Sequence, residues 1–124
     1  MRVLVFGASI TQGFYDLEGG WVDRLRRHYD QQKISREVAD PPTIFNLGIS
    51  ADTIGDVIKR FKPETEARKR HGDLTFIFSV GTNNAAEGGG LSFDPDKYRD
   101  DLKALLNQAR EYKTYTTGRL AVMR

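Results

Sequence analysis

Three short segments of the chain carry residue types that together can attack an acyl carbon. Ser9 supplies a hydroxyl within residues 7–13 (GASITQG), while Gly48 opens residues 48–53 (GISADT) and Asn83 lies in residues 81–84 (GTNN). A serine hydroxyl is a nucleophile for acyl transfer, and glycine N–H groups and an asparagine carboxamide can donate hydrogen bonds to the oxyanion that results. Gly48 follows Ser9 by 39 residues and Asn83 follows Gly48 by 35, about one strand-and-helix unit each.

Each of these segments follows a short apolar run that is typical of a buried parallel strand. The runs cover residues 2–6, 43–47 and 74–80, and each is bounded by Gly, Pro or Asp. In an open α/β sheet, the carboxyl ends of parallel strands share one edge, where ligands bind. We therefore expect Ser9, Gly48 and Asn83 to meet at that edge.

Helical periodicity fills the intervals between the strands. Asp52 or Ser50 is a candidate cap for the second helix, with Thr53 as a further capping residue, and Pro63 is expected to end or restart that helix. The third helix begins at Asp94, with a proline at its first position. The apolar stripes are Trp21, Val22, Leu25 and Tyr29 in the first helix, Ile54, Val57, Ile58 and Phe61 in the second, and Tyr98, Leu102, Leu105, Leu106, Ala109 and Tyr112 in the third.

This order of elements predicts one α/β domain over residues 1–124. We expect a flavodoxin-like, three-layer α/β/α architecture with a parallel sheet, in which the first strand is central and the second and third strands flank it. Residues 113–124 form an atypical tail, and Leu120–Met123 would make a poor fourth strand.

Composition excludes several classes of protein. The 124 residues contain no cysteine, which rules out disulfides and thiolate metal sites, and we expect neither a metal nor a cofactor. No apolar run approaches the roughly 18 residues of a membrane span. With no signal segment visible, a cytoplasmic location is the default expectation. The net charge of +2 comes from well-mixed charges, and the basic run at residues 68–71 is interpreted as a solvated helix end, so no nucleic-acid partner is expected.

Three blocks of the sequence resemble the GDSL/SGNH hydrolases, a family of serine esterases, lipases and acylhydrolases. Residues 7–11 (GASIT) resemble the family's first block, residues 46–50 (NLGIS) its second, and residues 81–84 (GTNN) its third. The resemblance implies that Ser9 is the nucleophile of a serine ester hydrolase acting on a small-molecule ester. It also implies that the Ser9 N–H, Gly48 and Asn83 form the oxyanion hole.

The sequence departs from the family pattern in two respects. Ala8 and Asn84 stand where the family usually has aspartate. The family's Asp-x-x-His block, which carries the catalytic base, does not occur, so the chain is predicted to be C-terminally truncated relative to the family and weakly active or inactive. His71 precedes the third strand, roughly 23 Å from the site edge, and His28 is interpreted as a partly buried helix histidine.

Two other functions remain open at this stage. One is a non-catalytic remnant that keeps the fold and half of the site. The other is a small-ligand or phosphate-binding α/β module, although residues 7–13 match neither of the common phosphate-binding fingerprints.

The strand predicted at residues 74–80 is expected at, or one strand from, a sheet edge. This predicts a homodimer or a higher even oligomer, with Leu120–Met123 as the alternative, intrachain cover.

Overall fold

The computed structural model describes residues 1–70, 72–86, 93–112 and 120–122. Strands and helices alternate along most of the chain, as the sequence predicts. The elements are β1 (Arg2–Gly7), α1 (Ser9–Gln12), α2 (Gly20–Ile34), β2 (Thr43–Gly48), α3 (Ile54–Arg68), β3 (Leu74–Ser79), α4 (Thr82–Ala86), α5 (Pro95–Arg110) and β4 (Leu120–Val122).

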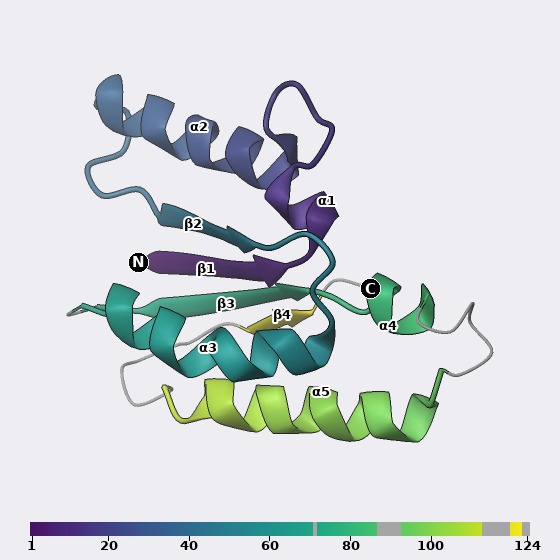
Figure 1. Ribbon diagram of the computed structural model, residues 1–124. Coiled ribbons are helices and arrows are strands. Elements are labelled where there is room, and N and C mark those ends of the chain that lie inside the picture. The colour runs from purple at the N-terminus through teal and green to yellow at the C-terminus, as the bar shows by residue number, and fades with distance from the viewer. Residues whose placement is uncertain (71, 87–92, 113–119, 123–124) are drawn as a thin grey trace.

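The strands form a parallel sheet in the order β2-β1-β3-β4 (Figure 1). This confirms that β1 is central and that β2 and β3 flank it. Because all pairs are parallel, the arrowheads of β1, β2 and β3 point to the same side, where α1, α4 and the first turn of α3 lie. The sheet therefore gathers the loops that follow its strands at one edge.

The expected fourth strand is also present, and it lies beside β3. Residues 120–122 pair in parallel with residues 76–78 of β3, so β3 is one strand from the sheet edge. The C-terminal strand β4 therefore pairs with β3 inside the chain, which was the alternative to pairing with a second copy. The homodimer stays a prediction.

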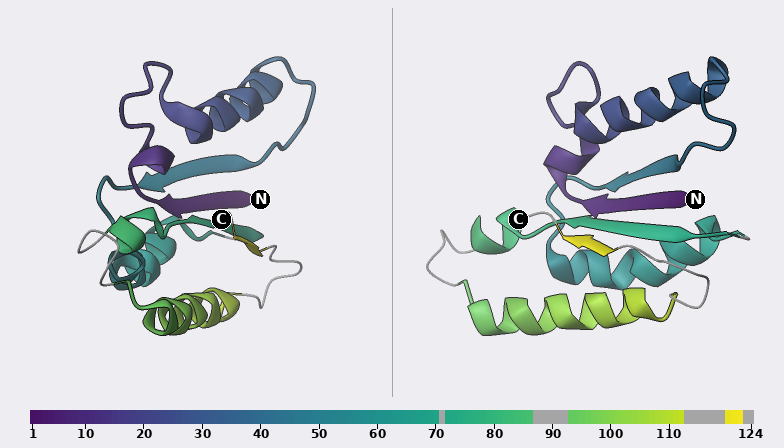
Figure 2. Two further views of the ribbon diagram at one scale, coloured as in Figure 1. Left: turned by 90° about the vertical axis from the view of Figure 1, so that its right-hand side faces the viewer. Right: turned by 180° about the vertical axis from the view of Figure 1, so that it is seen from behind.

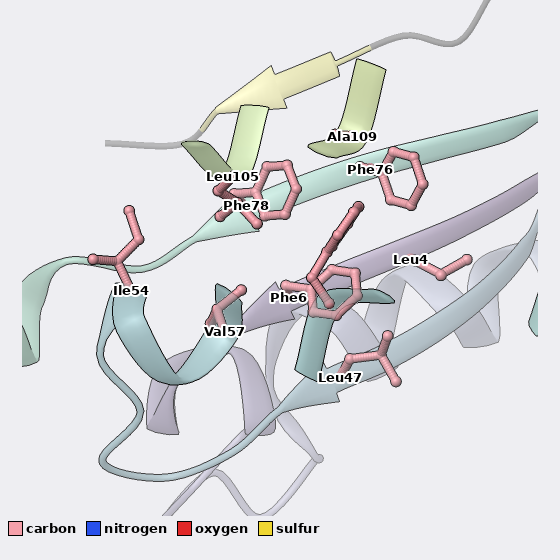
Figure 3. Close-up of a cluster of buried hydrophobic side chains, with 10 residues drawn as sticks. Leu4, Phe6, Leu47, Ile54, Val57, Phe76, Phe78, Leu105 and Ala109 are labelled. Carbon is pink, nitrogen blue, oxygen red and sulfur yellow. The ribbon is translucent and has the colours of Figure 1, made fainter. Parts of the chain in front are cut away.

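Side chains of β1 alternate between two apolar layers. Val3 and Val5 pack with Val22 of α2, whereas Leu4 and Phe6 join a larger cluster with residues of α3 and α5. Figure 2 shows α2 on one face of the sheet and α3 and α5 on the other, and Figure 3 shows the larger cluster. Strand geometry explains the split, because successive side chains of a strand point to opposite faces. The three-layer prediction is confirmed.

Phe61 of α3 lies at the centre of the larger cluster. Its ring is fully buried and lies 5.2 Å from the ring of Phe6 and 5.1 Å from that of Phe76, between centroids. Tyr112, just beyond α5, packs against the same ring at 5.9 Å. The aromatic contacts thus fix α3 and the end of α5 against the central strands.

The start of α3 decides between the capping residues that the sequence offered. Thr53, rather than Asp52 or Ser50, is its N-cap residue, and the Asp56 carboxylate accepts hydrogen bonds from the Thr53 N–H (3.1 Å) and hydroxyl (2.7 Å). The Thr53 side chain in turn accepts from the Asp56 N–H, so the two residues form the reciprocal arrangement of a capping box. This capping box is less apparent in the sequence because its third helical position holds Asp56 instead of the usual glutamate or glutamine.

Pro63 neither ends nor restarts α3, so that expectation was wrong. The helix continues from Ile54 to Arg68 through the proline. Phe61 and Thr65, on either side of it, are both fully buried. Tertiary packing on both sides therefore outweighs the lost backbone hydrogen bond.

Other helix expectations hold. The Asp94 side chain accepts from the N–H groups of Asp96 and Lys97, which confirms the predicted start of α5. Among the helices described, none combines the length and the apolar character that crossing a membrane requires.

The capping box makes stability depend on pH. Hydrogen bonds from the Thr53 hydroxyl and N–H, and from Lys59, lower the pKa of Asp56 from 3.8 to about 2. A pKa lowered by folding contributes stability above about pH 4 that is lost as the pH falls toward 2. Since 42% of this side chain is exposed, solvent screening limits the contribution to about 1 kcal/mol or less.

Asp56→Asn should lower the free energy of unfolding at pH 7 by about that amount.

Urea denaturation between pH 2 and 7 checks this expectation. The difference in the free energy of unfolding between wild type and Asp56→Asn should shrink toward zero as the pH falls to 2. Asp30→Asn serves as the control, because Asp30 is an exposed aspartate on α2. A gap that stays constant over the whole range would contradict the assigned role of Asp56.

Candidate active site

Ser9 sits where the buried central strand turns into a short helix. Residues 3–7 of β1 are buried, and Ser9 is the first residue of α1. Ala8 is the N-cap residue and has no side chain that could cap the helix, but its carbonyl accepts from the Gln12 N–H at 2.9 Å. Within the described part of the chain, no residue hydrogen-bonds to the Ser9 hydroxyl. Because Ser9 opens a helix, no carbonyl of α1 pairs with its N–H.

Two glycines let α1 lie directly on the ends of the strands. A Cβ added to Gly48, the last residue of β2, would overlap the backbone of Gln12 and lie 2.8 Å from its Cα. A Cβ on Gly7 would overlap the Thr11 side chain and lie 2.7 Å from the Ser79 carbonyl oxygen. Gly48 is therefore required by close packing, with an ordinary negative φ, rather than by turn geometry. This contact brings the helix of Ser9 against Gly48.

Hydrogen bonds then join the first loop to the second. The Ser50 N–H donates to the Gln12 side chain at 2.7 Å, and the Ile49 N–H donates to the Gly7 carbonyl at 3.1 Å. The Gly48 N–H donates to the Asn46 side chain at 3.0 Å. This last bond is a local Asx-type turn that closes β2. It also means that the Gly48 donor is engaged in this structure.

The short helix α4, which contains Asn83 and Asn84, is tied to the second loop by their two adjacent carboxamides. The Asn83 side chain donates to the Asp52 carbonyl at 2.8 Å. The Asn84 side chain accepts from the Ile54 N–H, at the start of α3, at 3.0 Å. An asparagine carboxamide has two N–H donors, so among the described residues one Asn83 donor is left without a partner. The structure thus links all three sequence-predicted segments into one network at the carboxyl edge of the sheet.

Arg60 is a component of this edge that the sequence did not reveal. Its side chain is only 15% exposed and forms an ion pair at 2.8 Å with Asp52, whose side chain is 12% exposed. A second guanidinium nitrogen donates to the Gly7 carbonyl at 3.3 Å, and the group lies 5.5 Å from the centre of the Phe6 ring. Asp52 therefore binds Arg60 instead of capping α3. The one signal in the sequence that could have indicated a buried arginine was its position directly before Phe61, a residue of the apolar stripe.

The two histidines do not complete the site within the described residues. His28 is exposed on α2, where its ring lies 3.3 Å from the Gln32 side-chain nitrogen, so the expectation of a partly buried residue was wrong. It lies eight residues into a helix that begins at Gly20, about 12 Å along the axis. His71 lies outside the described residues. No group of three His, Asp or Glu side chains that could hold a metal occurs in the parts of the chain described.

Apolar side chains border the site on its solvent side. Ile10 and Ile49, which directly follow Ser9 and Gly48, are 68% and 46% exposed. Phe14, Tyr15 and Leu17, in the loop after α1, are also exposed. Ile10 and Ile49, the exposed residues next in sequence to Ser9 and Gly48, are together called the apolar rim.

Comparisons with known proteins identify a matching family model and solved structures that share the fold. The family model described as GDSL-like lipase/acylhydrolase matches residues 5–123. No significant match is found among curated protein sequences. Similar solved structures include the SGNH-hydrolase family esterase AlinE4 (21% identity, TM-score 0.74), the esterase EstA from Pseudoalteromonas sp. inhibited by monoethylphosphonate (21%, 0.76) and TesA (22%, 0.73). They share the fold over 98% of this chain, which covers 57%, 58% and 59% of those chains, respectively. The chain thus spans a little over half their length.

The Gly48 contact can be tested by adding one methyl group. Gly48→Ala should push α1 away from β2 and lower the free energy of unfolding by about 1–3 kcal/mol, as overpacking does. Gly55 is the matched control because a Cβ there meets nothing closer than 3.7 Å, so Gly55→Ala in α3 should stabilise by about 0.5–1 kcal/mol. Chemical denaturation and the amide resonances of Ser9 and Gln12 measure both effects. Unshifted resonances with wild-type stability for Gly48→Ala would refute the packing argument.

Proposed function

The chain belongs to the GDSL-like lipase/acylhydrolase family, and we propose that it acts as a serine ester hydrolase with Ser9 as its nucleophile. The observation that carries this proposal is the network that joins the loops of Ser9, Gly48 and Asn83 at one sheet edge. Acyl transfer requires a nucleophile and oxyanion donors around one carbon, and this edge offers both.

The proposed reaction begins when the Ser9 oxygen bonds to the ester carbonyl carbon. The carbonyl π electrons move onto the oxygen, which becomes an oxyanion, while the serine proton passes to a base. The Ser9 N–H, the Gly48 N–H and the free Asn83 donor hold that oxyanion. The carbonyl then re-forms, the ester C–O bond breaks, and the base returns its proton to the leaving alkoxide, which departs as the alcohol. Water next attacks the acyl carbon, and the serine oxygen leaves with a proton from that water, which releases the acid.

Gly48 must change partner for this role. Its N–H donates to the Asn46 side chain, so the developing oxyanion competes with a neutral carboxamide oxygen. Hydrogen bonds to a charged acceptor are roughly twice as strong as those between neutral groups. In our proposal, Gly48 therefore binds the oxyanion more strongly than it binds the substrate carbonyl, which favours the transition state.

The apolar rim indicates the kind of ester. Ile10 and Ile49 flank Ser9 and Gly48 and are exposed, so they offer apolar surface next to the reacting carbon. We propose that the acyl chain or alcohol of the substrate covers part of this surface. Each buried CH₂ would contribute about 0.8 kcal/mol, so longer acyl groups should bind with lower KM.

We expect turnover by this chain to be slow. The Ser9 hydroxyl has no hydrogen-bond partner among the described residues, and His28 is exposed on α2, where its ring lies beside the Gln32 side chain. Serine enzymes that lose triad members typically lose about 10⁴–10⁶ in turnover. Water would then have to accept the serine proton.

Hydrolysis of p-nitrophenyl acetate, butyrate and octanoate by the purified chain tests the proposal. We expect turnover well below the 1–10³ s⁻¹ of ordinary enzymes, with activity lost in Ser9→Ala. Ser50→Ala is the matched control, since Ser50 lies on the same edge and uses its backbone N–H there.

Two outcomes would contradict parts of the proposal. Equal rates for wild type and Ser9→Ala would remove Ser9 as nucleophile and favour the non-catalytic alternatives, a remnant or a small-ligand-binding module. A Ser9-dependent turnover in the ordinary range would instead show that the chain supplies an efficient base.

A further inference from the structure

Arg60 reaches from the second turn of α3 to the Gly7 carbonyl, which precedes the turn at Ser9. Its Nε donates to the Asp52 carboxylate at 2.8 Å, and its Nη2 donates to the Gly7 carbonyl at 3.3 Å. The planar guanidinium has donors in a fixed fork, so a single group can hold two acceptors in a set geometry. Arg60 thus connects the strand end that precedes Ser9 with the loop that follows Gly48.

The same loop orients Asn83. The Asp52 carbonyl accepts from the Asn83 side chain at 2.8 Å, while its carboxylate is held by Arg60. The position of the Asp52 main chain therefore determines where the Asn83 carboxamide points. A residue that fixes Asp52 also fixes Asn83.

The conformation of this loop needs such support. Residues 49–52 form a turn in which the Asp52 N–H donates to the Ile49 carbonyl at 3.2 Å, and Ala51 has a φ of 70°. A positive φ is unfavourable for alanine, and strained positions persist where surrounding contacts determine them. The ion pair between Arg60 and Asp52 directly adjoins this residue.

Stability alone does not account for the arginine. Both partners are largely buried, and such pairs lose in desolvation much of what they gain in attraction. Within the described part of the chain, the buried Nη1 of Arg60 also has no partner. An apolar side chain on α3 would fill the same position without these costs.

We propose that Arg60 is a positioning residue for the oxyanion hole. It holds Asp52 so that the Asp52 carbonyl aims the Asn83 carboxamide at the acyl oxygen, and it holds the Gly7 carbonyl beside the Ser9 turn. This inference rests on the proposed ester hydrolysis for its effect on catalysis. Its structural part concerns the Asn83 carboxamide and is measurable without substrate.

The test uses Arg60→Met, Arg60→Lys and the exposed control Lys62→Met on the same helix. In nitrogen–proton correlation spectra, Asn83→Ala identifies the Asn83 carboxamide signals by their disappearance. Arg60→Met should shift these signals and increase hydrogen exchange at that carboxamide about tenfold or more, because its anchor is loosened. Arg60→Lys should give a smaller change, and Lys62→Met none.

The catalytic part is tested with p-nitrophenyl butyrate. Arg60→Met should lower kcat roughly 10- to 100-fold with KM changed less than about twofold, and Arg60→Lys should recover part of the loss. In the Asn83→Ala background, Arg60→Met should cost almost nothing more, because the two residues act through one group.

Each outcome bears on the proposal separately. Unchanged Asn83 signals in Arg60→Met, or an equal loss of kcat with and without Asn83, would overturn the positioning role. If wild type and Ser9→Ala hydrolyse the ester equally, the proposed function fails, and the Asn83 spectra still decide whether Arg60 orients the carboxamide. If Arg60→Met does not fold, Arg60→Lys decides the same question, because an ammonium group lacks the guanidinium's fixed fork.

Discussion

The backbone of α1 rests on the backbone of Gly48, and the geometry of the site depends on that contact. A side chain at Gly48 would overlap Gln12, so a helix could not begin at Ser9 and still touch the end of β2. Interiors are packed densely enough that a single methyl group at such a point displaces an element. Because Gln12 then bonds to Ser50, the same contact sets the course of the loop that leads to Asp52.

The rest of the fold holds this contact rigidly. β1 is buried on both faces, with Val3 and Val5 facing one apolar layer and Leu4 and Phe6 the other. Ser9 therefore follows a strand that cannot shift without disturbing both layers. Arg60, by contrast, brings a charge to the end of the same strand. In our proposal, Arg60 orders loops that the sheet does not order itself, and this role explains why the desolvation cost of a buried charge is tolerated here.

Much of this arrangement was predictable from the sequence because it depends on local patterns. Apolar runs bounded by turn residues located three strands, and the i, i+3, i+4, i+7 stripe from Ile54 to Phe61 located a helix, since both patterns follow from backbone periodicity. The convergence of the loops followed from the parallel order. The catalytic roles of Ser9, Gly48 and Asn83 remain predictions.

The parts that sequence reasoning missed depend on contacts between distant segments. Pro63 was expected to break a helix, but burial of Phe61 and Thr65 holds the helix through it. Arg60 contacts Gly7 across 53 positions of sequence, which no periodicity reveals. His28 was judged from its neighbours on the apolar face, whereas a small rotation around the helix decides whether a residue is exposed.

We propose that Ser9, Gly48 and Asn83 surround one tetrahedral centre. An alkylboronic acid tests it directly, because the serine oxygen adds to boron to form a tetrahedral boronate and no leaving group is needed. In a nitrogen–proton correlation titration, we expect the signals of the Ser9 N–H, the Gly48 N–H and the Asn83 carboxamide to shift together with a single Kd, and not at all in Ser9→Ala. Shifts confined to one of the three, or retained in Ser9→Ala, would contradict it.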